Sequence, residues 1–106
     1  MLSRYGESAS PEGQRFFQLA LRDSTIRAIR DALEESAASA LLHFLSSSPP
    51  ISAEKIHTML NDLLDSGAVV IERRIILELY KKLDLRYSER LGFDFERMAA
   101  EGLANA

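Results

Sequence analysis

The chain has 106 residues, of which 46% are hydrophobic and 27% charged, and its formal net charge at pH 7 is −3. These values are typical of one ordinary globular domain, which can bury a core without disulfide or metal cross-links. Cysteine is absent, which excludes a disulfide framework, a thiolate metal site and a redox-active thiol. The slightly acidic balance argues against general affinity for nucleic acid.

The N-terminal residues 1–10 are polar and small, and they predict a flexible tail before a single helical domain over residues 11–104. They contain no apolar run typical of a signal peptide. The longest apolar runs in the chain are far shorter than the ~18 residues that a membrane-spanning helix needs. We therefore expect a cytoplasmic protein.

Ser10 and Pro11 predict the start of a first helix, because a serine cap followed by proline at the first helical position is a typical start signal. Its apolar residues at helical spacing are Phe16, Leu19, Ile26, Ile29 and Leu33, with Phe17 and Ala20 beside them. The pattern continues to Glu35 but is interrupted at residues 23–25, where an aspartate, a serine or a threonine can cap a new helix. The sequence leaves open one long helix or two helices with a kink.

Two shorter helices are predicted next. Ser36 is the expected cap of a helix over Ala37–Leu45, and the Ser/Pro-rich residues 46–50 are the clearest loop in the chain. Ser52 then caps a further helix. Gly67 is expected to end that helix as a glycine at the C′ position.

The segment 67–85 is the longest continuous pattern, and it predicts a central helix around which the others pack. At about 100° per residue, its core-facing residues are Ala68, Ile75, Ile76, Leu79 and Leu83, flanked by Val69, Ile71 and Tyr80. A strand over Val69–Leu79 is the alternative, because three of its first residues are β-branched. Apolar and polar residues do not alternate there and no turn residue interrupts the segment, so we predict a helix.

Two apolar residues, Val70 and Leu77, fall on the polar side of this predicted helix, seven residues apart. They are either covered by a further helix of the same chain or form a contact surface for a second chain. In the second case the neighbouring basic residues form a polar rim. The candidate interface is Val70, Arg73, Arg74, Leu77 and Lys81.

Glu72 is predicted to lie among the core-facing residues, where an ionised carboxylate needs a cationic or multiply hydrogen-bonded partner. We expect a structural ion pair with an arginine of the first helix. His43 and His57 have no further ligand at helical spacing and are interpreted as surface or edge residues. No glycine-rich phosphate loop or nucleophile motif is present. The sequence therefore predicts no catalytic, cofactor-binding or metal-binding residue and no small-molecule ligand.

Residues 86–92 are polar and predict a loop, after which Asp94 caps a short helix from Phe95 to about Leu103. The predicted elements are helical throughout and their connections are short. The fold expected is all-α, a compact bundle or orthogonal array of four to five helices with one long central helix.

The central pattern combines Gly67-Ala68, Val70-Ile71-Glu72, Ile75-Ile76, Glu78-Leu79-Tyr80 and Leu83. In this it resembles a family of small archaeal helical domains of unknown biochemistry, proposed as signalling output domains in Nitrosopumilus-type archaea. The likeness covers residues 19 to about 100. The chain departs from the family at Asp84, where glycine is frequent, and in the shorter loop 46–50. The resemblance implies a helical, non-enzymatic module and brings no catalytic residues with it.

Three functions compete at this point. The first is an interaction or regulatory module, self-associating through the central helix, which accounts for the surplus apolar residues on that helix. The second is a winged-helix-like nucleic-acid binder, with Ser52–Ser66 as recognition helix and Val69–Leu79 as wing. The third is a small enzyme without a recognisable motif. We prefer the first, which implies a protein partner or a homo-oligomer rather than nucleic acid or a membrane.

Overall fold

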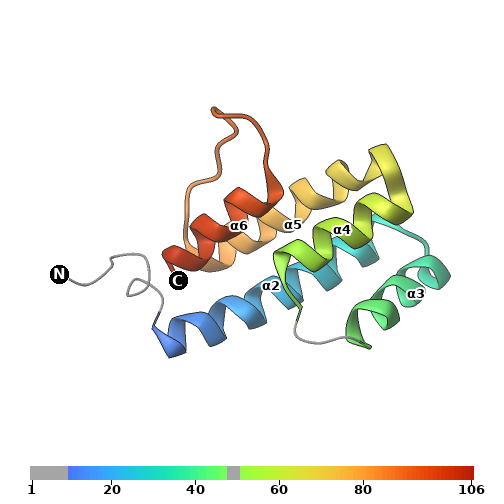
Figure 1. Cartoon of the computed structure of the whole chain (residues 1–106), viewed down its shortest axis with the longest axis horizontal. Coiled ribbons are helices and arrows are strands. Elements are labelled where there is room, and N and C mark those ends of the chain that lie inside the picture. Colours follow the sequence, from blue (N-terminus) through green and yellow to red (C-terminus); the bar gives the residue numbers. More distant parts are fainter. Residues whose placement is uncertain (1–9, 48–50) are drawn as a thin grey trace.

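The computed structural model describes residues 10–47 and 51–106, which form five α-helices and one 3-10 turn with no strand among them (Figure 1). The helices are α2 (Pro11–Ala32), α3 (Glu35–Ser46), α4 (Ala53–Leu64), α5 (Ala68–Leu83) and α6 (Phe95–Ala104), and the turn is η1 (Asp65–Gly67). The predicted all-α fold is therefore confirmed. The predicted tail and the middle of the predicted loop, residues 1–9 and 48–50, lie outside the described residues.

Helix α5 lies at the centre of the fold and packs against α2, α4 and α6. Helix α2, the longest with 22 residues, runs antiparallel to it, since ion pairs join Asp23 to Lys82 and Asp31 to Arg74 along the two helices. Helix α4 also contacts α6, whereas α3 packs against α2. In Figure 1, α3 stands at the lower right and α6 at the upper left. The body of the molecule is thus α2, α4, α5 and α6, with α3 attached at one side.

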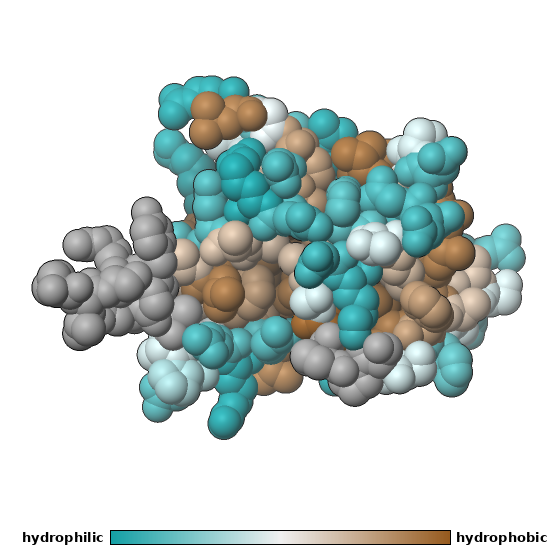
Figure 2. Space-filling model, viewed as in Figure 1, coloured by the Kyte–Doolittle hydropathy of each residue, from teal (hydrophilic) through white to brown (hydrophobic). Residues whose placement is uncertain are grey.

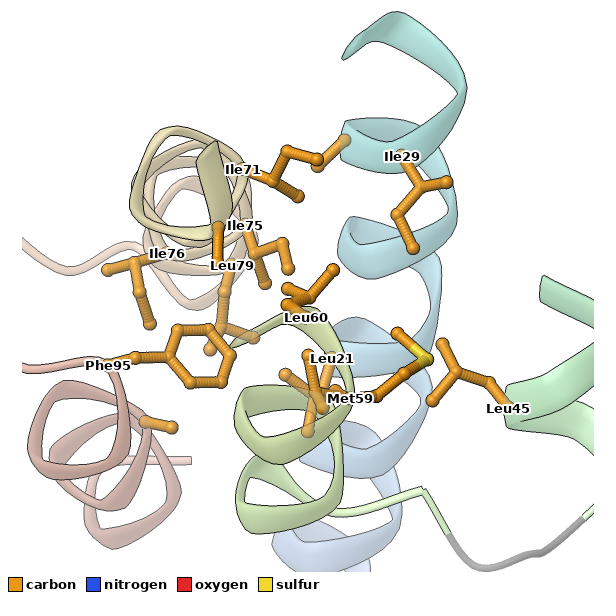
Figure 3. Close-up of a cluster of buried hydrophobic side chains, with 14 of the residues drawn as sticks. Leu21, Ile29, Leu45, Met59, Leu60, Ile71, Ile75, Ile76, Leu79 and Phe95 are labelled. Atoms are coloured by element: carbon orange, nitrogen blue, oxygen red, sulfur yellow. The ribbon is translucent and has the colours of Figure 1, made fainter. Parts of the chain in front are cut away.

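The core lies between the helices of this body, where side chains from α2, α4, α5 and α6 meet (Figure 3). Leu21, Leu60 and Leu79 are completely buried, and Phe95 of α6 reaches the same cluster. The buried apolar residues of α5 are Ala68, Ile71, Ile75, Ile76, Leu79 and Tyr80. The core face predicted for the central helix is confirmed, except that Leu83 is only half-buried.

Helix α2 is one continuous helix that begins at Pro11, where the Ser10 hydroxyl accepts a hydrogen bond from the Gly13 amide at 3.0 Å. It is not interrupted at residues 23–25, because the Thr25 hydroxyl donates to the Leu21 carbonyl at 2.7 Å and stays inside the helix. The question left open by the sequence is answered in favour of one helix.

The buried face of α2 differs from the predicted one. Phe16 and Leu19 were expected inward but are 49% and 59% exposed. The buried residues are Phe17, Ala20, Leu21, Ser24, Thr25, Ala28 and Ile29. Four of these side chains are small or carry only a hydroxyl group, and such a face lets a neighbouring helix backbone approach closely. Of the large apolar side chains on which the prediction rested, Phe16 and Leu19 lie outside this close contact, whereas Ile29 is completely buried as predicted and Ile26 and Leu33 are half-buried.

Two helix ends were predicted wrongly. Helix α3 begins at Glu35 with Glu34 as its cap, and the Ser36 hydroxyl donates to the Glu34 carboxylate at 3.3 Å instead of capping the helix. Helix α4 ends at Leu64, and the chain turns at Asp65, which has a φ of 55°. Gly67 has a φ of −71° and leads directly into α5, so it is not a C′ glycine. The positive φ expected at Gly67 is found at Asp65 instead, because a short aspartate side chain tolerates this conformation.

The segment assigned to a wing in the nucleic-acid-binding hypothesis, residues 69–79, lies entirely within α5. A winged-helix geometry is therefore wrong for this part of the chain. Over residues 10–47 and 51–106, no helix combines the length and apolar character required to cross a membrane.

Candidate functional site

The candidate interface predicted on the central helix lies on the exposed side of α5. Val70 is 65% exposed and Leu77 is 39% exposed, two helical turns apart and opposite the core face. We call the surface formed by Val70, Arg73, Arg74, Leu77 and Lys81 the α5 ridge. None of the described helices covers it, so the first of the two explanations offered by the sequence is wrong. The contact surface for a second chain stays a prediction.

Ion pairs hold the two arginines of the α5 ridge at its edges. The Arg73 guanidinium lies 2.9 Å from the Glu89 carboxylate and over the Phe93 ring, 5.2 Å from its centroid. On the other edge, Arg74 pairs with Asp31 of α2 at 2.8 Å. Along the helix the two arginines lie between Val70 and Leu77, and both aliphatic side chains are exposed to solvent.

The loop after α5 stabilises the edge of the α5 ridge at which Arg73 lies. The Tyr87 hydroxyl donates a hydrogen bond to the Glu89 carboxylate, which also accepts from Arg73. Burial, together with this hydrogen bond, raises the pKa of Tyr87 to about 12. Hydrogen bonds from Arg73 and Tyr87 lower the pKa of Glu89 below its ordinary value. The loop thus holds Arg73 in a defined position at one edge of the ridge.

A second apolar surface lies between the end of α2, helix α3 and the C-terminal half of α4. It is a groove of about 520 Å³ in which Asp62 is the only charged lining residue. Its lining residues are Leu33, Ala37, Ala40, Leu41, Phe44, Met59, Asp62, Leu63 and Leu64. We call it the α3–α4 groove. Figure 2 shows apolar patches breaking a largely hydrophilic surface, including at the right-hand end over α3.

The sequence did not reveal this groove. Two of its lining residues, Leu63 and Phe44, are 57% and 56% exposed. Both residues are apolar and sit at helical spacing with buried neighbours, so periodicity alone cannot separate them from the core. Only the position of α3 beside α2, away from α5, leaves the space between α3 and α4 unfilled.

One acidic side chain lies in the α3–α4 groove, and three more acidic residues neighbour its lining residues along the chain. Glu34 and Glu35 lie between the lining residues of α2 and α3, Asp62 lies inside the groove, and Asp65 follows its last lining residue. All four side chains are exposed, and none of them forms an ion pair with another described residue. The groove therefore combines an apolar lining with one unpaired carboxylate, that of Asp62.

A second hollow, of about 690 Å³, lies along α2 and is bordered by Lys82 of α5. Phe16, Leu19 and Ile26 form its apolar part, and the Lys82–Asp23 ion pair of 3.3 Å closes one side. It is the place where the apolar residues wrongly assigned to the core of α2 come together.

Glu72 is buried, with an exposed fraction of 3%, as the sequence predicted. Its partner is not an arginine of the first helix. The carboxylate lies 2.5 Å from Nδ1 of His57 on α4, and the Asn61 amide donates to it at 3.4 Å. The His57 ring stacks on Phe95 with centroids 6.3 Å apart. Helix α4 supplies the partner because it packs beside α5, while the arginines of α2 point to solvent.

Burial raises the pKa of Glu72 above its ordinary value, and the hydrogen bond with His57 opposes that shift. The hydrogen bond between the imidazole and the carboxylate supplies the polar partner that a buried acid needs. The spacing of His57 and Asn61, one helical turn apart, was the sequence signal for this cluster. It was not connected to Glu72 because the two segments meet only in the folded chain.

Among the described residues, no group of three or more His, Cys, Asp or Glu side chains is arranged to hold a metal ion. No protein-family model matches the sequence, and comparisons with curated proteins and with solved structures find no match. The resemblance to archaeal signalling output domains therefore stays a prediction from the central pattern. The functional argument rests on the exposed apolar surfaces of the chain itself.

Proposed function

We propose that the protein is a non-enzymatic interaction module that self-associates through the α5 ridge. The observation that carries the proposal is the exposure of Val70 and Leu77 on the face of α5 opposite the core. Exposed apolar side chains with polar or charged neighbours around them are typical of a contact surface. The resemblance to signalling output domains supports the same proposal, because such a domain acts by binding.

The expected contact is weak. Burying an exposed aliphatic side chain contributes about 1.5–3 kcal/mol, and association of two proteins costs several kcal/mol in lost freedom. The α5 ridge offers two such side chains per chain, so we expect a transient complex that forms as the concentration rises. The ion pairs of Arg73 and Arg74 favour it, because side chains that are already held lose less entropy on binding.

Solution mass tests the proposal. Light scattering is measured from about 10 µM to about 1 mM, the range in which weak contacts dissociate. We expect the wild-type mass to rise with concentration and the Leu77→Glu variant to stay monomeric. Val70→Glu is the second variant, because Val70 is more exposed than Leu77 and its replacement perturbs the fold less.

The matched control is Leu91→Glu, which places the same charge on a leucine that is 82% exposed in the loop after α5. It is expected to associate like the wild type. A wild-type chain that stays monomeric across the whole range contradicts the proposal. So does a Val70→Glu variant that is folded by circular dichroism and still associates.

A further inference from the structure

We propose that the α5 ridge of one chain binds in the α3–α4 groove of a second copy, so that the chains associate head to tail. This inference rests on the proposed self-association and names the surface that receives the ridge. It differs from the simplest dimer, in which two α5 ridges face each other across a two-fold axis.

Charge favours the groove over a second ridge. The charged members of the α5 ridge are Arg73, Arg74 and Lys81, and Lys81 forms no ion pair with another described residue. Arg73 and Arg74 are already paired with Glu89 and Asp31, and a second ridge contains no carboxylate for Lys81. The α3–α4 groove instead contains the Asp62 carboxylate, which has no ion-pair partner among the described residues. Lys81 of one chain can therefore pair with Asp62 of the next, whereas like charges across an interface are strongly unfavourable.

Shape favours the same pairing. The ridge is convex, with its two aliphatic side chains seven residues apart on one helix, and helices recognised in grooves present anchors at such spacings. The groove is concave and apolar, with Phe44 and Leu63 exposed at its walls. Two convex ridges would touch along a narrow line, whereas a ridge in a groove is covered on both sides.

The two surfaces share no residue, so one chain can use both at the same time. Such a heterologous contact does not stop at a dimer. It continues into a chain of copies, or into a ring if the rotation between neighbours closes. We therefore expect the wild-type mass to exceed that of a dimer at high concentration.

Two complementary variants test the inference. Val70→Glu breaks the ridge and leaves the groove intact, whereas Leu63→Glu breaks the groove and leaves the ridge intact. Both positions are more than half exposed, so both variants are expected to fold. Leu91→Glu again serves as the control. Mass is measured by light scattering for each variant alone and for the equimolar mixture.

Head-to-tail association predicts that each variant alone is monomeric and that the mixture forms a heterodimer and nothing larger. In the heterodimer the intact ridge of Leu63→Glu fills the intact groove of Val70→Glu, and no intact surface is left to bind a third chain. If Leu63→Glu associates like the wild type, the groove is not the receiving surface and the inference is wrong, while the proposed function stands. If the wild type is monomeric throughout, the proposed function fails and the inference fails with it.

A charge exchange gives an independent readout. Lys81→Glu and Asp62→Lys are each expected to weaken self-association by at least about tenfold at low salt, because each places like charges in the contact. The double variant Lys81→Glu with Asp62→Lys restores opposite charges between neighbouring chains and is expected to recover the association. A double variant weaker than both single variants would overturn the charge argument.

Discussion

Helix α5 departs from a simple amphipathic pattern on both of its sides, with a charged residue on the buried side and apolar residues on the exposed side. The two departures are resolved in opposite ways. On its buried side, Glu72 obtains two polar partners, His57 and Asn61, from the neighbouring helix α4. On its exposed side, Val70 and Leu77 receive no cover from any described helix. A buried carboxylate without partners costs several kcal/mol and must be satisfied within the chain. An exposed aliphatic side chain costs little, so it can remain available for another molecule.

The largest difference in stability between the two sides of α5 is expected when Leu79 and Leu77, two residues apart, are each replaced by alanine. Leu79 is completely buried, so Leu79→Ala should lower the free energy of unfolding by about 2–5 kcal/mol. Leu77→Ala, on the exposed side, should change it by less than about 1 kcal/mol. Urea unfolding at low protein concentration, where association is absent, measures both. Equal losses would place Leu77 in the core and remove the ridge.

Removal of the buried carboxylate is expected to have an intermediate effect. Glu72→Ala removes the partner of the His57 ring and one of the acceptors of the Asn61 amide, which also donates to the His57 carbonyl. We expect a loss of about 1–3 kcal/mol in the free energy of unfolding. The loss is limited because the His57 side chain is partly exposed to solvent, unlike a fully buried arginine without a partner. The isosteric Glu72→Gln variant keeps a hydrogen-bonding group and should lose less than Glu72→Ala. A loss in Glu72→Ala as small as that of a surface substitution would contradict the observed burial.

The pH dependence of stability isolates the charge of Glu72. A carboxyl group whose pKa is raised by burial contributes stability that is fully present below its ordinary pKa and is lost as the pH rises through the raised value. The wild type should therefore lose stability relative to Glu72→Gln as the pH increases from about 4 to about 7. Unfolding curves of both proteins at matched pH values give the difference. A difference that changes in the opposite direction would mean that the contact with His57 outweighs burial.

The smallest effect is expected at the edge of the ridge. The pKa of Tyr87 is raised to about 12, and Glu89→Gln should lower it because the variant removes the charge that accepts the phenol hydrogen bond. Ultraviolet titration of the phenolate measures the shift, with Tyr87→Phe identifying the signal. If Glu89→Gln leaves the titration unchanged, the loop does not hold Arg73 as described, and the rim of the ridge is less ordered than the buried side of α5.

Most of the fold could be predicted because the signals are local. The caps at Ser10, Ser52 and Asp94 each accept a hydrogen bond from an amide three residues later, and they define where α2, α4 and α6 begin. The burial of Glu72 also followed from the sequence, since an acid among core-facing residues of a periodic helix has nowhere else to lie. Its partner did not follow, because His57 is fifteen residues away and meets Glu72 only when α4 packs on α5.

Helix α2 shows why the candidate surfaces were less predictable. Its sequence carries large apolar residues on one flank and small residues on another, and periodicity shows only that both flanks exist. Close packing against α5 buried Ala20, Ser24 and Ala28 and left Phe16 and Leu19 exposed. The α3–α4 groove arose in the same way, since the exposure of Leu63 depends on where α3 packs.

The sequence by itself determined the helical class, the start of most helices and the core face of α5, because these depend on hydrogen bonds and spacings within one helix. The tertiary structure decided which face of α2 is buried, which side chain satisfies Glu72 and where apolar surface stays exposed. These outcomes depend on the distance between helices that are far apart in the chain, and packing sets that distance only when all the helices are present together.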